Sequence, residues 1–176
     1  NAVNIVGTTA QVTAALVTDA TKVSVSDATV ALDDGETPTI SQLNDIADAT
    51  DGVVTATLAE NTLANFATLA TEATDVITVT VNDDAGETLT ASALSTLGGK
   101  TAGTVTVSNA VVISGTQSQV TAALVTDATK VEAGSALVTI GDGDGVTLNA
   151  EDLSALGGKT AGTVTVTNAV AITGNH

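Results

Sequence analysis

Internal repetition is the feature that most limits how this chain of 176 residues can fold. Residues 91–115 return at 150–174 with a shift of 59 positions, and within them the stretch GGKTAGTVTV is unchanged. Residues 7–23 return at 115–131 with two differences in 17 positions. Repeats of a few tens of residues are typical of proteins whose units cannot bury a core alone and therefore stack on one another.

The composition favours a narrow interior. Hydrophobic residues make up 43% of the chain, yet Phe66 is its single aromatic residue, and it contains no Trp, Tyr, Met or Cys. Wide protein interiors usually need aromatic rings to fill them. A core of Val, Ile, Leu and Ala therefore indicates an elongated molecule with one layer of side chains across its interior.

Apolar residues at helical spacing predict several short helices. They lie at 10–17, 40–49, 61–70, 91–98, 118–125 and 150–157. Thr8 with Gln11, and Thr116 with Gln119, fit a capping box at a helix start, and Asn149 is expected to cap the last helix. Gly98 and Gly157 are expected to end two of the helices in the left-handed conformation.

Between these segments Val and Thr alternate, as in strands that bury one face. The expected strands contain Val23 and Val25, Ile77 to Val81, Val105 and Val107, and Val164 and Val166. Crossovers between parallel strands are right-handed in nearly all proteins. The sequence thus predicts an α/β right-handed repeat solenoid of about six coils, each with short parallel strands and a short helix. The alternative is a pair of tandem all-β sandwiches.

The charge excludes several partners. The net charge is -16, with four Lys and no Arg, so nucleic acid is not an expected partner because phosphates need clustered basic side chains. No run of 18 apolar residues occurs, so no membrane insertion is expected. Each lysine follows a predicted helix, where a cation stabilises the C-terminus; the alternative is a ladder that binds an anionic polymer. These lysines are Lys22, Lys100, Lys130 and Lys159.

Three Asp-rich turns are candidates for calcium sites. They contain Asp33 and Asp34, Asp83 and Asp84, and Asp142 and Asp144. Calcium prefers several oxygen ligands in flexible geometry, and GDGDGV at 141–146 resembles part of the nonapeptide of calcium-binding toxin repeats, here in one copy. The alternative is ordinary turn chemistry, with acids placed near helix N-termini.

Two further functions are weighed from residue types. Thr-x-Thr pairs in the strands resemble the ice-binding face of some antifreeze proteins, although Thr also suits any exposed strand face. Catalysis is not expected. The only histidine is His176, so a Ser–His–Asp arrangement cannot form within the chain. Paired Asp residues can hydrolyse glycosides, but the absence of Arg and the helical spacing of Phe66 disfavour a sugar site.

The stretches ISGTQSQVTAALVTDATKV (113–131) and TISQLNDIADAT (39–50) resemble repeats of giant surface and secreted proteins of cyanobacteria and other marine bacteria, often described as hemolysin-type or cell-surface repeat proteins. The resemblance implies a long extracellular array with structural, adhesive or motility roles. Because NAVNIVG (1–7) matches NAVAITG (168–174), residues 1–176 are expected to be one solenoid segment cut from a longer array.

We therefore expect a non-enzymatic spacer or stalk segment of a large extracellular or cell-surface repeat protein, without a cofactor. Its expected partners are neighbouring repeats of the same chain, and end-to-end self-association is anticipated through exposed strand edges. A calcium-dependent adhesin and an ice-binding module are the alternatives.

Overall fold

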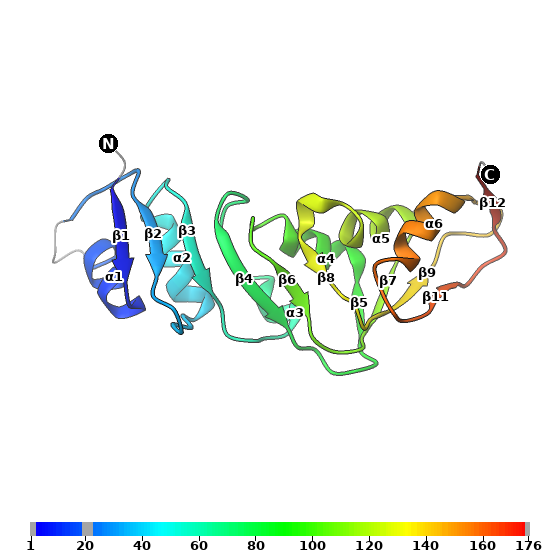
Figure 1. The fold of residues 1–176 in the computed structure, drawn as a ribbon, viewed down its shortest axis with the longest axis horizontal. Coiled ribbons are helices and arrows are strands. Elements are labelled where there is room, and N and C mark those ends of the chain that lie inside the picture. Colours follow the sequence, from blue (N-terminus) through cyan, green and yellow to red (C-terminus); the bar gives the residue numbers. More distant parts are fainter. Residues whose placement is uncertain (1–2, 19–22, 175–176) are drawn as a thin grey trace.

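A computed structural model describes residues 3–18 and 23–174. The molecule is elongated, and its strands lie side by side along the long axis (Figure 1). The two ends of the chain lie at opposite ends of this axis.

Short strands and helices alternate along the chain. The strands are β1 (Asn4–Gly7), β2 (Thr29–Leu32), β3 (Val54–Thr57), β4 (Val76–Val81), β5 (Thr88–Thr90), β6 (Val105–Val107), β7 (Val112–Gly115), β8 (Val131–Glu132), β9 (Leu137–Ile140), β10 (Thr147–Asn149), β11 (Val164–Val166) and β12 (Ala171–Thr173). The helices are α1 (Thr9–Leu16), α2 (Ile40–Asp48), α3 (Leu63–Phe66), α4 (Ala91–Gly98), α5 (Gln117–Leu124) and α6 (Ala150–Gly157), with a 3₁₀ turn η2 at Asp127–Thr129.

All the strand pairs in the described residues are parallel. One sheet has the order β1-β2-β3-β4-β6-β8, a second β11-β9-β7-β5, and a third β10-β12. The α/β class is thus confirmed, with parallel sheets. The all-β sandwich alternative is wrong, because sandwiches are built from antiparallel sheets without intervening helices.

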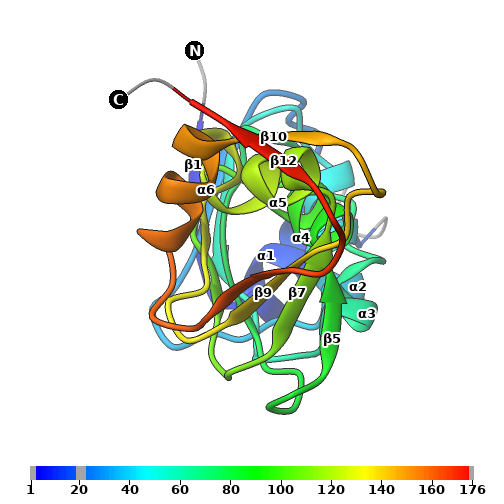
Figure 2. The ribbon, with the colours of Figure 1, turned by 90° about the vertical axis from the view of Figure 1, so that its right-hand side faces the viewer.

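The number of strands between helices grows along the chain. Among the described residues, a single strand precedes each of α1, α2 and α3, two precede each of α4 and α5, and three precede α6. Consequently the two copies of GGKTAGTVTV, which end in β6 and β11, keep the same local pairing but lie in different sheets. β6 pairs with β4, and β11 pairs with β9, which is the sequence counterpart of β4. Figure 2 shows the end of the molecule that carries α6, β10 and β12.

A single hydrophobic cluster runs through the interior. It is lined by one face of each central strand, as the alternation predicts, and by the inner faces of the helices. Val79 and Val105 are fully buried, as is Leu43 of α2. Phe66 is 1% exposed, so its ring belongs to the core and is not presented to a ligand.

The helix starts follow the sequence closely. Capping boxes are present at Thr8 and Thr116 as predicted, and a third is present at Thr39. The Asn149 side chain accepts a hydrogen bond from the Glu151 amide at 2.8 Å. The helix predicted at 61–70 is shorter than expected, because only α3 forms there.

Two local predictions are wrong. Gly98 and Gly157 are the last residues of α4 and α6, and the residue that follows each is right-handed, with φ of -72° at Gly99 and -77° at Gly158. Residues 23–28 form no strand. Their sequence counterpart β8 pairs with β6, whereas no described strand precedes β1 to pair with Val23.

Candidate functional site

Buried threonines join neighbouring units after three of the helices. Thr50, Thr101 and Thr160 are 8%, 2% and 9% exposed. Thr101 Oγ1 accepts hydrogen bonds from the amides of Ile77 and Gly103 at 2.8 Å, and it lies 2.8 Å from the Ile77 carbonyl oxygen, to which it can donate. Thr50 and Thr160 likewise donate to the carbonyl oxygen of a preceding unit. These hydroxyls are therefore used within the fold.

The glycine two residues after each of these threonines allows the close approach. A Cβ at Gly52, Gly103 or Gly162 would lie 2.1, 2.4 and 2.1 Å from the carbonyl oxygen of the neighbouring unit. A side chain at any of them would push the two units apart. The repeated Thr-x-Gly pattern is thus a packing motif, and it accounts for the Thr and the Gly of the repeated KTAG.

Between β3 and β4, Asp75 takes the position that Thr50, Thr101 and Thr160 take between other strands. It is 3% exposed, and its Oδ1 and Oδ2 accept from the amides of Val54 and Glu72, both at 2.8 Å. A buried carboxylate is often catalytic, but both oxygens of this one are held by backbone amides. Sequence reasoning missed Asp75. The sequence feature that could have identified Asp75 is its spacing in the repeat, because it lies 25 residues after Thr50 and 26 before Thr101.

The three acidic turns share one backbone geometry. Gly35, Gly86 and Gly145 have φ of +87°, +83° and +76°, at the position where a type II turn requires a positive φ. In each turn the amide of the residue after the glycine donates to the carbonyl oxygen three residues earlier, at 3.0 to 3.2 Å. The glycines are therefore explained by the turn itself.

One carboxylate from each acidic turn caps a helix of the preceding unit. Glu36 accepts from the Thr9 amide at 2.8 Å, Asp83 from Leu63 at 2.7 Å, and Asp142 from Gln117 at 2.6 Å. The donors are the first residues of α1, α3 and α5. The backbone hydrogen bond from Thr9 is the main reason that the pKa of Glu36 lies below its ordinary value, with the Thr9 side chain second and desolvation opposing both.

The predicted calcium residues are thus distributed among several roles. Asp83 and Asp142 cap helices, and Asp144 accepts from the Ala169 amide at 3.1 Å. Asp33, Asp34 and Asp84 are exposed. Within 3–18 and 23–174, the structure brings no three His, Asp or Glu side chains close enough to hold a metal ion. Calcium binding by these turns stays a prediction.

Lys100 contacts the C-terminal end of a helix. Its Nζ donates to the carbonyl oxygens of Ala67, at 2.9 Å, and Leu69, just after α3. A cation at a helix C-terminus is the structural role expected for the lysines. Lys100, however, follows α4 in the sequence and contacts the end of the preceding helix, α3. Lys130 and Lys159 are exposed, and Lys22 lies outside the described residues.

Hydroxyl side chains form one row across the second sheet. Thr90, Ser114, Thr139 and Thr165 are in register on β5, β7, β9 and β11. The row two residues away begins Thr88, Val112, Leu137 and is mostly apolar. In the six-stranded sheet Thr80 and Thr106 are followed by Glu132. Ice binding by threonine rows stays a prediction.

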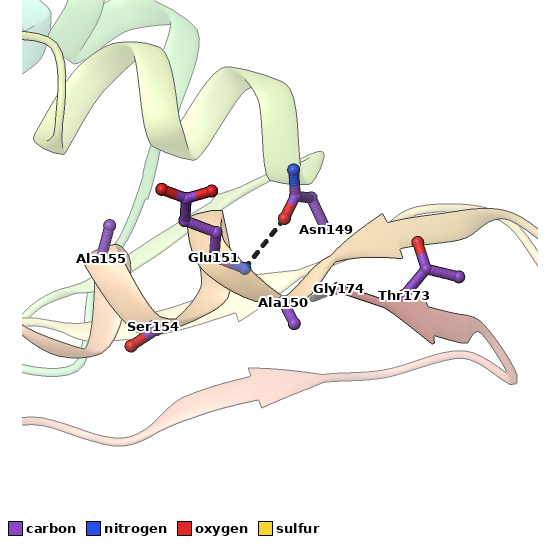
Figure 3. Close-up of a pocket in the computed structure, with 7 residues that line it drawn as sticks. All are labelled: Asn149, Ala150, Glu151, Ser154, Ala155, Thr173 and Gly174. Carbon is purple, nitrogen blue, oxygen red and sulfur yellow. Dashed lines mark hydrogen bonds between the residues drawn. The ribbon is translucent and has the colours of Figure 1, made fainter. Parts of the chain in front are cut away.

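A surface pocket of about 870 Å³, open to solvent, lies between α6 and β12 (Figure 3). Its lining includes Asn149, Ala150, Glu151, Ser154, Thr173 and Gly174. Glu151 is the one carboxylate of this lining, so the pocket does not present the pair of acids that glycoside hydrolysis uses. Apart from Glu151, the residues that line it are small or uncharged.

Among the helices of the described part of the chain, none has the length and apolar character required to cross a bilayer. Comparisons of the chain with protein-family models, with curated proteins and with solved structures found no match.

Proposed function

We propose that this chain is a non-enzymatic structural spacer, one segment of a right-handed solenoid in a large extracellular or cell-surface repeat protein. The observation that carries this proposal is the pairing of successive strands along the long axis, from β1 to β8 in one sheet and from β5 to β11 in another (Figure 1). Each added strand lengthens such a molecule by about 4.8 Å.

The use of the polar side chains supports a mechanical role. Buried hydroxyls and carboxylates that would suggest chemistry in another fold bind backbone groups of an adjacent unit, as Thr101, Asp75 and Asp83 do. Stability of such a stack is approximately the sum of unit and interface terms. Length and stiffness are then the properties that repetition supplies.

The proposed setting rests on the resemblance to surface and secreted repeat proteins and on the charge. A net charge of -16 keeps an extended protein soluble and discourages side-to-side association. An extracellular stalk needs both properties.

Small-angle X-ray scattering of the dilute chain tests the spacer. A rod of the dimensions of the structure is expected, with the same cross-section before and after calcium is added at matched ionic strength. A globular scattering profile would overturn the proposal. A calcium-dependent change in shape would favour the second candidate.

The second candidate is a calcium-dependent adhesin, and the exposed carboxylates of Asp33, Asp34 and Asp84 favour it. A calcium-binding protein gains about 2.7 kcal/mol when the ion is a hundredfold above its dissociation constant. Thermal unfolding with calcium and then with chelator measures this gain. The Asp84→Asn variant is the control, because a gain from the second turn should fall in it.

A further inference from the structure

The chain contains four Asp–Gly pairs, and such a pair can react with itself. They are Asp34–Gly35, Asp51–Gly52, Asp142–Gly143 and Asp144–Gly145. The amide nitrogen of the glycine can attack Cγ of the aspartate and close a five-membered ring, because a glycine has no Cβ to obstruct the approach. The attack is intramolecular, so its rate depends on whether the two groups are free to meet. A hydrogen bond to either group restrains the pair.

Two of the pairs are each restrained by one hydrogen bond. The Gly52 amide donates to Thr50 Oγ1 at 3.0 Å, so the nitrogen that would attack is engaged. The Asp142 carboxylate is the cap described above, and its Oδ2 accepts from the Gln117 amide at 2.6 Å. The group that would be attacked is therefore held against α5.

The pairs Asp34–Gly35 and Asp144–Gly145 occupy equivalent positions of two acidic turns, with φ of +87° and +76° at the glycines. In the second turn Asp144 Oδ1 accepts from the Ala169 amide at 3.1 Å, and the Gly145 amide donates to the Ala169 carbonyl oxygen at 2.8 Å. In the first turn neither the Asp34 carboxylate nor the Gly35 amide has a hydrogen-bond partner within 3–18 and 23–174, and Asp34 is exposed. The two turns thus differ in restraint and share their backbone.

The number of strands in the next unit explains this difference. The Ala169 that holds Gly145 lies in the corner after β11, and in the equivalent corner after β6 the Ala110 carbonyl oxygen accepts from the Gly86 amide at 2.9 Å. Both corners lead into a second strand, whereas β3, which lies beside β2 (Figure 1), leads directly to α3. The turn after β2 therefore has no corner to restrain it. Units lie on both sides of this turn, so its freedom does not come from an end of the chain.

We propose that Asp34 is a site of spontaneous backbone modification to isoaspartate. The Gly35 nitrogen forms a bond to Asp34 Cγ, and the bond from Cγ to one carboxyl oxygen breaks. That oxygen leaves as water, with the proton of the amide and the proton of the carboxyl group. Water then opens the cyclic imide: addition at Cγ restores aspartate, and addition at the main-chain carbonyl carbon gives isoaspartate of unchanged mass.

The modification should weaken a contact between two units. Isoaspartate adds a methylene to the backbone of the turn, so the hydrogen bond from the Glu36 amide to the Asp33 carbonyl oxygen, at 3.1 Å, no longer fits. The Glu36 carboxylate leaves this turn to accept from the Thr9 amide at the start of α1. Loss of that cap should lower the unfolding temperature of the modified chain relative to the parent.

Ageing of the whole folded chain at mildly acidic pH, well below its unfolding temperature, tests the proposal. A protease that cleaves before aspartate but not before isoaspartate, followed by mass spectrometry with electron-transfer fragmentation, measures isoaspartate at each pair. Isoaspartate at Asp34 should exceed that at Asp144 several-fold. Asp34→Glu keeps the charge but needs a larger ring for the same attack, and it should reduce the modification of this turn to background.

The same chain aged in guanidinium chloride is the matched control, because unfolding removes the hydrogen bonds of all four pairs. The ratio of the rate in the folded chain to the rate in the unfolded chain should be highest at Asp34. Equal ratios at Asp34 and Asp144 would overturn the proposal. So would a folded chain without isoaspartate at Asp34 after a time in which the unfolded chain has reacted. The reaction depends on this turn alone, so either result leaves the proposed spacer function to its own test by scattering.

Discussion

At the scale of single residues, identical sequence meets different surroundings. Gly98 and Gly157 occupy the same place in the two copies of GGKTAGTVTV. A Cβ on Gly98 would be 2.1 Å from the Thr129 carbonyl oxygen, and a Cβ on Gly157 would meet no heavy atom of the described residues within 4 Å. The glycine is therefore required by a neighbour in one copy and is only tolerated in the other.

Gly98→Ala should destabilise the protein by about 1–3 kcal/mol, because the backbone of η2 must move away. Gly157→Ala should be neutral or should stabilise the protein by up to about 1 kcal/mol, because Ala has a higher helix propensity than Gly at this last position of α6. Urea denaturation of the two variants measures both effects. Equal losses in the two variants would contradict the close approach at Gly98.

Glu36 makes part of the stability depend on pH. Its pKa in the folded protein lies below the ordinary value of 4.5, so its contribution is present above that value and is lost as the pH falls through the folded pKa. Glu36→Gln keeps an oxygen for the Thr9 amide but removes the charge. The difference in unfolding free energy between parent and variant should shrink as the pH is lowered below 4.5. A difference that stays constant in urea titrations across this range would contradict the assignment.

At the scale of elements, the helices are too short to be stable alone and depend on neighbouring units. Isolated helices shorter than about 12–15 residues are marginal in water, and α3 has four residues. Its first amide, at Leu63, donates to Asp83 from the turn between β4 and β5. The acidic turns thus couple each capped helix to the unit that follows it.

Asp83→Ala should cost about 1–3 kcal/mol, because the buried Leu63 loses the acceptor for its amide. Asp84→Ala removes an equal charge from the same turn, where the side chain is exposed, and should change stability by less than about 0.5 kcal/mol. Thermal unfolding of the pair gives the comparison. Equal losses of stability in the two variants would show that the charge of the turn stabilises the protein and that the hydrogen bond from Leu63 to Asp83 does not.

At the scale of the whole molecule, like charges oppose folding. Twenty acidic residues face four lysines, and the lysine with assigned contacts, Lys100, binds backbone carbonyls at the end of α3. Self-repulsion of this kind destabilises the compact state. Salt should therefore stabilise the fold as a whole.

Raising the ionic strength from about 0.01 M to 0.15 M shortens the Debye length from roughly 30 to 8 Å. The unfolding temperature should rise, by roughly 2–4 °C for each kcal/mol of repulsion removed. Calorimetry in sodium chloride measures the rise, and calcium chloride at matched ionic strength is the control for specific binding. A fall in unfolding temperature would contradict net repulsion.

The sequence by itself determined the class of the fold and most of its helices. Period and caps act within a few residues, so five of the six expected helices were found close to their predicted bounds, with Thr8, Thr116 and Asn149 as caps. The sixth, predicted at 61–70, forms only as α3. The alternation of Val and Thr placed β4, β6 and β11 for the same reason, but the prediction around Val23 is wrong. The helical spacing of Phe66 correctly indicated that its ring lies in the core.

Only the tertiary structure decided which units meet, because such contacts join residues 20 or more positions apart. The capping of α3 by Asp83, the burial of Asp75 and the close approach at Gly98 depend on the neighbouring unit. For the same reason the two copies of one ten-residue stretch lie in different sheets, and Ile113 is buried while Ile172 is exposed. Local sequence forms the units, and the presence or absence of a neighbour decides what each residue does.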